Sequence, residues 1–149
     1  MARIPYFVPA EKDKDKSLLQ GKAPFDLNIF KMITHAPIDI ARQFIGLPAV
    51  VLTKGKLDPI LREMAITRAG ILCNSQYEVH QHVKICKRVG MSNDKIKALD
   101  IGSTAPVFSE VERLVLLFTE ETVLKRKVSD ETFAAISKHF SHEQLVELA

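Results

Sequence analysis

The sequence has few cysteines, no long apolar run and no large excess of charge of one sign, and each shortage narrows the possible functions. Two cysteines among 149 residues, Cys73 and Cys86, cannot make a disulfide framework, so we expect a reduced, cytoplasmic protein. The longest nearly apolar stretch, residues 45–52, contains Gly46 and Pro48 and is too short to cross a bilayer. Neither a membrane span nor a signal peptide is expected.

The charge distribution does not predict a nucleic-acid-binding surface. The net charge is only +3, and the two basic clusters, residues 12–22 and 125–127, are short and lack interleaved aromatic side chains. We interpret them as solvated surface and expect neither nucleic acid nor a membrane as a partner.

Period-two alternation is also scarce, because only residues 49–53 show it weakly. The chain is long enough for one core, with 46% apolar and 26% charged residues. Residues 1–24 are rich in Pro and Lys and predict an irregular arm. Residues 25–149 have helical apolar spacing and predict one all-α domain.

Helix boundaries are indicated by prolines and capping residues. The spacing predicts a helix that ends before Pro37 and a second segment, residues 38–45, that Pro48 interrupts or kinks. Asp58 and Pro59 begin a helix expected to reach about residue 72. The pattern Ser-x-x-Glu or Ser-x-x-Gln predicts capping boxes at Ser75, Ser109 and Ser141, and the helix from Ser75 is expected to end at Gly90. Further helices are expected to begin at Ser92 and Ser129.

The last predicted helix is short. From Ser141 it has about two turns, with Leu145, Val146 and Leu148 as its apolar side chains. Because two isolated turns are marginal, we expect them to pack against another element, such as one from a neighbouring subunit.

The candidate site is a group of proton-handling residues within the apolar helical pattern. At about 100° per residue, the side chains of Ser75, Glu78, His82 and Cys86 fall within a stripe about 80° wide. A carboxylate and an imidazole one turn apart can share a proton, as general acid–base catalysis requires. Glu63 can reach the same place if its helix packs antiparallel to this one.

Each of these residues also has a structural interpretation. Ser75 and Glu78 can form a plain capping box, and Glu78 can pair with His82 on the surface. Glu63 can form a local ion pair with Arg62 or Arg68.

The other histidines predict no metal pair. His80 and His82 point about 160° apart on a helix and cannot hold one ion together. A metal bound by Glu63, Glu78 and His82 is a remaining alternative, although we expect no metal or cofactor. His35 is interpreted as a helix cap, and His139 and His142 as surface residues.

The two cysteines are too far apart along a mostly helical segment to form a disulfide within one subunit. We expect buried, inert thiols. Cys86 is the more interesting, because it lies one turn from His82 and could be activated by it.

Several motifs together resemble the carboxymuconolactone decarboxylase family, which includes the alkylhydroperoxidase D-like proteins. The resemblance covers roughly residues 25–149 and is carried by Leu57-Asp58-Pro59, Leu61-Arg62-Glu63-Met64-Ala65-Ile66, Tyr77-Glu78-x-x-x-His82-Val83 and Gly90-Met91-Ser92. Arg3-Ile4-Pro5-Tyr6 and Ser129-Asp130-Glu131-Thr132 are similar to one subgroup, which has the Tyr-Glu signature and lacks a Cys-x-x-Cys motif. The resemblance implies an all-α, alkylhydroperoxidase D-like helical bundle. It also implies a homo-oligomer, commonly a trimer or hexamer, with active sites near subunit contacts.

In the hydroperoxidase branch, a Glu precedes a Cys-x-x-Cys-x-x-x-His motif that relays protons to a thiol pair. By that resemblance the Glu falls on Glu63 and the His on His82, while the two thiol positions hold Ser75 and Glu78. The relay ends are therefore present and the redox centre is absent.

The leading hypothesis is thiol-independent acid–base chemistry on a small lactone or unsaturated carboxylic acid. His82 is the expected general acid or base, Glu63 orients it and sets its proton affinity, and Glu78 is a second proton carrier. Tyr77 and the helix start at Ser75 are expected to bind substrate.

Two other hypotheses stay open. One is an alkylhydroperoxidase or peroxiredoxin-type antioxidant activity that uses Cys86 or Cys73. The other is a non-catalytic helical oligomer or small-molecule binding module, in which Glu63 and His82 are a buried structural pair.

Overall fold

A computed structural model describes residues 3–8 and 27–149. Within these ranges the chain forms helices and no strand, which confirms the all-α prediction. The chain divides into two compact units, Met1–Gly55 and Lys56–Ala149. The predicted boundary between arm and domain, at residue 24, lies outside the described residues and stays a prediction. No described helix is both long and apolar enough to span a bilayer.

The first unit contains α2 (Asn28–Ile33) and α3 (Ile38–Lys54). Residues 5–7 run along α2, where the Phe7 N–H donates to the carbonyl oxygen of Lys31 at 3.2 Å. His35 does not cap the helix as expected. Its Nε2 lies 2.8 Å from the carbonyl oxygen of Pro5, and Thr34 occupies the C-cap position.

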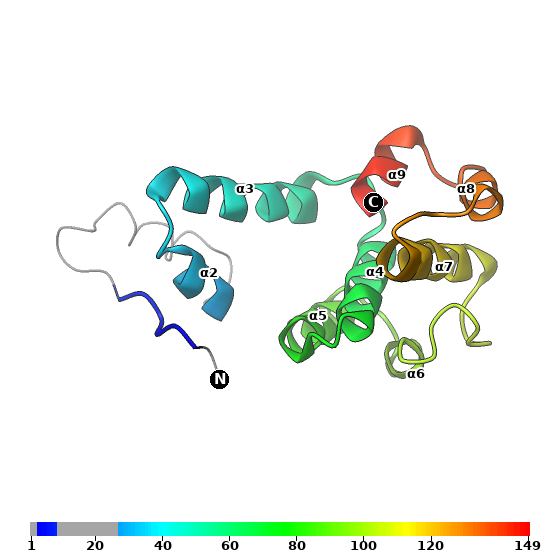
Figure 1. The fold of residues 1–149 in the computed structure, drawn as a ribbon. Coiled ribbons are helices and arrows are strands. Elements are labelled where there is room, and N and C mark those ends of the chain that lie inside the picture. The colour runs from blue at the N-terminus through cyan, green and yellow to red at the C-terminus, as the bar shows by residue number, and fades with distance from the viewer. Residues whose placement is uncertain (1–2, 9–26) are drawn as a thin grey trace. The chain divides into compact units, whose positions relative to one another are not determined.

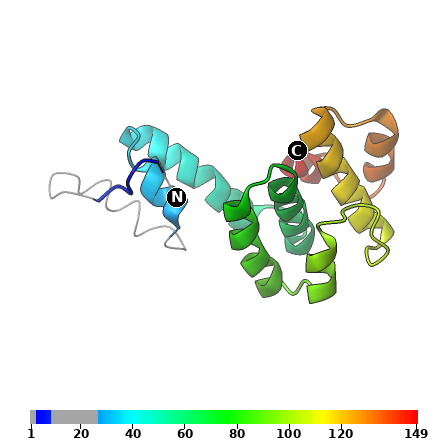
Figure 2. The same cartoon turned by 60° about the horizontal axis from the view of Figure 1, so that its bottom comes forward.

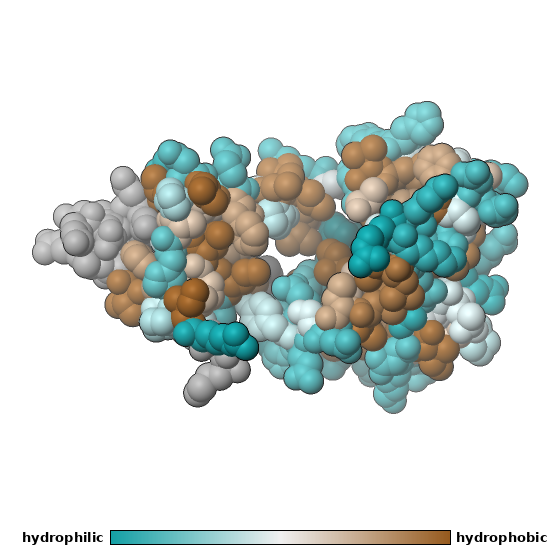
Figure 3. Space-filling view, viewed as in Figure 1, coloured by the Kyte–Doolittle hydropathy of each residue, from teal (hydrophilic) through white to brown (hydrophobic). Residues whose placement is uncertain are grey.

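Helix α3 continues through Pro48, so the predicted interruption is wrong. Proline removes one backbone donor, but the residues on both sides have the apolar spacing of a helix and keep its path. The weak alternation at residues 49–53 is also helical, with Thr53 Oγ1 donating to the Ala49 carbonyl at 2.7 Å. One face of α3 exposes large apolar side chains: Ile40, Phe44, Leu47 and Val50. Figure 3 shows brown, hydrophobic surface on the described part of this unit.

The second unit is built around α4 (Pro59–Leu72), which packs against both α5 (Gln76–Arg88) and α7 (Glu110–Lys125). A short turn joins α4 to α5, and the two helices lie side by side in Figures 1 and 2. They approach closely at Gly70, where an added Cβ would lie 3.2 Å from the Val79 side chain. The expected α4–α5 hairpin is therefore present.

Most predicted caps are confirmed. The Asp58 carboxylate accepts from the first N–H groups of α4, and Ser92 and Ser129 cap α6 (Asn93–Ala98) and α8 (Asp130–Ile136). The boxes at Ser109 and Ser141 form as predicted, the latter opening α9 (His142–Leu148). The box at Ser75 is wrong. Ser75 precedes α5, but its hydroxyl makes no capping hydrogen bond.

Two apolar clusters make up the core of this unit. One lies among α4, α5, α6, α7 and the loop before α7: Met64, Cys86, Met91, Leu99, Phe108 and Leu116 among others. The other joins α4 and α7 to α8 and α9: Ala65, Val115, Phe118, Ile136 and Leu145. The two faces of α4 thus contribute to different clusters, which holds the helix in place from both sides.

Helix α9 packs within its own unit rather than requiring another subunit. Leu145 is buried in the second cluster. The Glu147 carboxylate accepts from the backbone N–H of Lys56 at 2.7 and 2.8 Å and from that of Leu57 at 2.8 Å. These hydrogen bonds connect the last helix to the segment that leads into α4.

A largely buried ion pair links α4 to α7. Arg68 Nε lies 2.9 Å from Glu120 Oε1, and Arg68 Nη1 donates to the carbonyl oxygens of Leu99 and Asp100, each at 2.9 Å. The Glu120 carboxylate also accepts from the N–H and hydroxyl of Ser103, at 2.9 and 2.6 Å. Residues 99–103 are therefore fixed against both helices, and Arg68 is not the partner of Glu63.

Candidate functional site

The α4–α5 hairpin brings Glu63 and His82 into direct contact. Glu63 is fully buried on α4, and its Oε2 lies 2.7 Å from Nδ1 of His82 on α5. Because a buried carboxylate is costly unless paired, the contact specifies how the two helices align. The expectation that Glu63 reaches the His82 stripe is met by the geometry.

Arg62 completes the surroundings of the Glu63 carboxylate. Its Nε lies 3.2 Å from Oε1, so each carboxylate oxygen has one nitrogen partner. The sequence offered the ion pair to Arg62 and the contact to His82 as alternatives, and the structure contains both.

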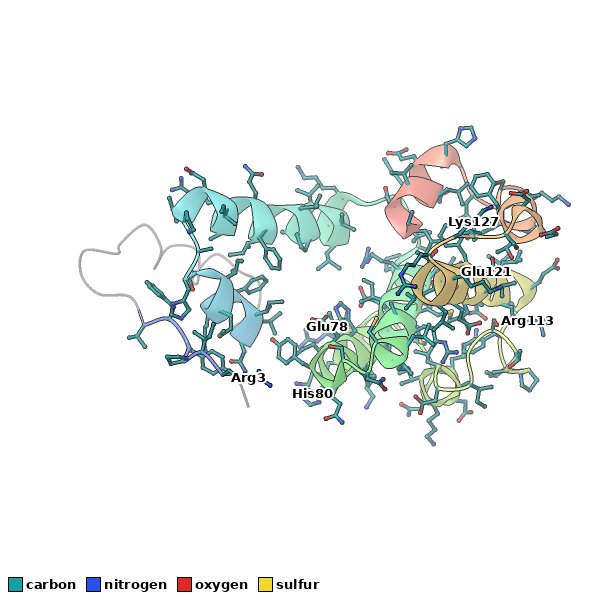
Figure 4. All side chains as sticks on the ribbon, viewed as in Figure 1. Arg3, Glu78, His80, Arg113, Glu121 and Lys127 are labelled. Atoms are coloured by element: carbon teal, nitrogen blue, oxygen red, sulfur yellow. The ribbon has the colours of Figure 1, made fainter. Side chains whose placement is uncertain are left out.

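Glu78 lies on the other side of the His82 ring. Nε2 of His82 is 3.5 Å from Glu78 Oε2, one turn earlier on α5. The exposed fraction of the side chain rises from 0% at Glu63 to 16% at His82 and 39% at Glu78. Figure 4 labels Glu78 on α5. The three groups form a row from the interior to solvent, along which a proton can pass.

The hydrogen-bond pattern assigns the ring nitrogens different roles. A carboxylate at Glu63 only accepts, so we assign Nδ1 of His82 as the donor of this hydrogen bond. Nε2 is then the nitrogen that can take or give a proton at the accessible end. The capping box at Ser75 is not formed, and the Glu78 carboxylate lies near His82.

The alternative of a metal bound by Glu63, Glu78 and His82 is wrong for this arrangement. The two ring nitrogens of His82 face different carboxylates, so the three side chains do not converge on one point. Within the described residues no group of three His, Cys, Asp or Glu side chains is placed to hold a metal ion.

Cys86 is not placed as an activated thiol. Cys86 is fully buried, and its Sγ lies 3.4 Å from Thr67 Oγ1. Burial raises the pKa of the Cys86 thiol, the Thr67 hydrogen bond lowers it in part, and the charge of Glu63 raises it further. The expected burial is wrong for Cys73, which is exposed at the end of α4, and both thiols are free.

The two predicted substrate-binding residues lie near the start of α5. Tyr77 is half-buried there. Ser75 lines an open groove of about 630 Å³ together with His80, Lys84 and Lys87. Glu63, Glu78 and His82 do not line this groove. The sequence grouped Ser75 with His82 by helical angle, and the structure instead groups it with His80.

The groove is the feature that the sequence interpretation missed. The spacing of His80, Lys84 and Lys87 on one helix side was visible, but the concave surface beside them depends on how α4 and α5 pack. His139 and His142 are exposed, as expected.

Comparison with known proteins gives two matches. The sequence model of the carboxymuconolactone decarboxylase family matches residues 39–121, which is more than half of the chain. The uncharacterized protein YnjA of Escherichia coli (strain K12) is 31% identical over 97 residues, which cover 64% of this chain and 53% of that protein. The chain therefore spans about half the length of the curated relative it matches. No solved structure gives a significant match.

Proposed function

Because this chain belongs to the carboxymuconolactone decarboxylase family, we propose that it is an acid–base enzyme acting on a small lactone or unsaturated carboxylic acid. One observation carries the proposal: the imidazole of His82 lies between a buried carboxylate at 2.7 Å and a half-exposed carboxylate at 3.5 Å. A ring held at Nδ1 and accessible at Nε2 is the arrangement that general acid–base catalysis needs.

The chemical step follows from that arrangement. The substrate carboxylate leaves as carbon dioxide, and the electron pair of the broken C–C bond passes into the adjacent unsaturated carbonyl system. Nε2–H of protonated His82 then gives its proton to the resulting carbanion carbon. Glu78, which contacts both His82 and solvent, returns a proton from water to Nε2. Glu63 holds the ring and stabilises its charged form throughout.

Substrate binding is proposed to use the start of α5. Ser75 does not cap the first-turn N–H groups with its hydroxyl, which supports a role for those groups toward an anionic oxygen. Tyr77, next to Glu78, is the proposed hydrogen-bond donor to substrate.

The assembly is proposed to be a cytoplasmic homo-oligomer, a trimer or hexamer. The exposed apolar stripe on α3 supports self-association, because such stripes on soluble proteins mark contact surfaces.

A peroxidase reaction through Cys86 is poorly supported. Its thiol is fully buried, its hydrogen bond goes to Thr67, and its raised pKa disfavours the reactive thiolate.

A second candidate function is a non-catalytic binding module in which Glu63 and His82 only hold the hairpin together. The specific observation in its favour is that the groove described above is not lined by either residue.

The substitution His82→Asn separates the two functions. The Asn amide can replace Nδ1–H toward Glu63 but has no counterpart of Nε2. With carboxymuconolactone as substrate, we expect carbon dioxide release to fall about 10²- to 10⁴-fold while the thermal midpoint changes little. His139→Asn, on the surface, is the matched control. Unchanged turnover in His82→Asn, or no turnover in the wild type with this substrate or related unsaturated lactone acids, contradicts the enzyme proposal.

A further inference from the structure

The open groove on α5 is a separate feature from the Glu63–His82–Glu78 row. Residues 80, 84 and 87 point away from His82, since His80 and His82 are about 160° apart around the helix. The groove has a volume of about 630 Å³, within the range of sites for small organic molecules. Figure 4 labels His80 on the same helix as Glu78.

The cationic side of the groove is supplied by one helix face. His80, Lys84 and Lys87 are spaced four and three residues apart, so they lie in a row along α5. Neither lysine has an ion-pair partner among the described residues. Asp100 is the acidic residue of the lining, so the two lysines exceed it in charge.

The floor of the groove is apolar. Ile71 at the end of α4 and Val79 and Val83 on α5 line it, and all three are only partly buried. Lysine stems add further apolar surface beside them. Amide side chains at Asn74 and Gln76 lie at the helix start and offer both donors and acceptors.

We propose that this groove binds a carboxylate that carries an apolar body of about the size of a fused aromatic ring pair. The carboxylate lies against Lys84 and Lys87, and the ring system covers Ile71, Val79 and Val83. A purely polar anion would leave the apolar floor exposed to water, and a neutral apolar molecule would leave the lysine row without a partner. None of the lining residues belongs to the proton row, and Ser75, at the proposed substrate-binding helix start, is the residue that the two proposed sites share.

The test uses 2-naphthoate as the probe and the full chain as the protein. Binding is measured by the fluorescence anisotropy of the probe, with 2-naphthalenemethanol as the uncharged analogue. We expect the double substitution Lys84→Glu and Lys87→Glu to weaken naphthoate binding at least 10-fold. Both side chains are exposed, so the fold is expected to be unaffected.

The matched control is Lys127→Glu with Lys138→Glu, which changes net charge equally at exposed lysines outside the groove. It should leave naphthoate affinity within about twofold, because screened charges far from the site contribute little. Adding salt should weaken naphthoate more than the alcohol. His82→Asn should bind naphthoate as the wild type does, so failure of the enzyme proposal leaves this result standing.

Three outcomes would overturn the proposal. The first is that the wild type does not bind naphthoate with millimolar or tighter affinity. The second is that both double variants lose the same amount of naphthoate affinity. The third is that the groove variant changes its oligomeric state in sedimentation while the wild type does not bind naphthoate. The last result would show that the groove is a contact between copies of the chain.

Discussion

Oε2 of Glu63 and Nδ1 of His82, from two different helices, are 2.7 Å apart, and Glu63 has no exposed surface. The contact therefore has two consequences. It fixes the register of α4 against α5, and it leaves Nε2 of His82 as the accessible nitrogen. A test of Glu63 has to separate these structural and chemical effects.

Removing the Glu63 carboxylate should destabilise the second unit. We expect Glu63→Ala to lower the free energy of unfolding by about 3–5 kcal/mol, because it leaves Arg62 and His82 without their shared buried partner. Glu63→Gln should cost less, since its amide oxygen still accepts from one of them. Urea unfolding followed by circular dichroism measures both, with exposed Glu143→Ala as the control. A loss below about 1 kcal/mol for Glu63→Ala would show that the pair does not hold the hairpin.

The two thiols should differ sharply in reactivity. In the native protein at pH 8, a disulfide reagent should modify Cys73 rapidly and Cys86 only after denaturant is added, because Cys86 is buried and its pKa is raised. Cys73→Ser should remove the fast phase entirely. Rapid modification of a second thiol in the native state, or its loss on treatment with peroxide, would revive the antioxidant hypothesis.

Glu121 should make stability depend on acid pH. The Ser129 N–H and the Lys125 ammonium lower the pKa of Glu121 to about 2 from 4.5. The Glu121 carboxyl group then binds a proton more weakly in the folded state than in the unfolded state. Its contribution to stability is therefore complete above about pH 4.5 and is lost as the pH falls toward 2. Glu121→Gln should flatten the decline in this window relative to the wild type. An equally steep decline in stability in both proteins would show that Glu121 does not cause it. Glu121 is labelled in Figure 4.

A side chain at Gly102 should destabilise the second unit. It has φ +87°, and an added Cβ would collide with the carboxylate of Glu120 and the guanidinium of Arg68. Gly90 has φ +93° with no atom within 4 Å of an added Cβ, so it isolates the backbone effect. We expect Gly90→Ala to lower the free energy of unfolding by about 1 kcal/mol and Gly102→Ala to lower it by at least twice that amount. Similar thermal midpoints for the two variants would show that the ion pair moves aside freely.

The helices of the second unit could be predicted because their signals are local. Asp58-Pro59, Ser109-x-x-Glu112 and Ser141-x-x-Gln144 each satisfy backbone donors within one turn, so nearby residues determine the outcome. Ser75-x-x-Glu78 has the same pattern and fails as a cap. There the Glu78 carboxylate lies 3.5 Å from His82, one turn later in the same helix, and this pair extends beyond the four-residue motif.

The site was predictable only in part for the same reason. The spacing of Glu78 and His82 predicts their contact, and the helical hairpin predicts that Glu63 can join them. The groove beside His80 results from the shapes of two packed helices and has no sequence motif. The effect of Pro48 on the helix also depended on its neighbours, since α3 continues through it despite one missing backbone donor.

The hydrogen bonds from Lys56 and Leu57 to Glu147 make the entry to α4 depend on residues that the ribosome adds much later. A nascent chain that has just released α4 and α5 can already bring Glu63 to His82, because both helices have emerged. The backbone N–H groups of Lys56 and Leu57 still lack the Glu147 carboxylate at that stage. The unit therefore completes this anchoring only after residue 147 has left the exit tunnel.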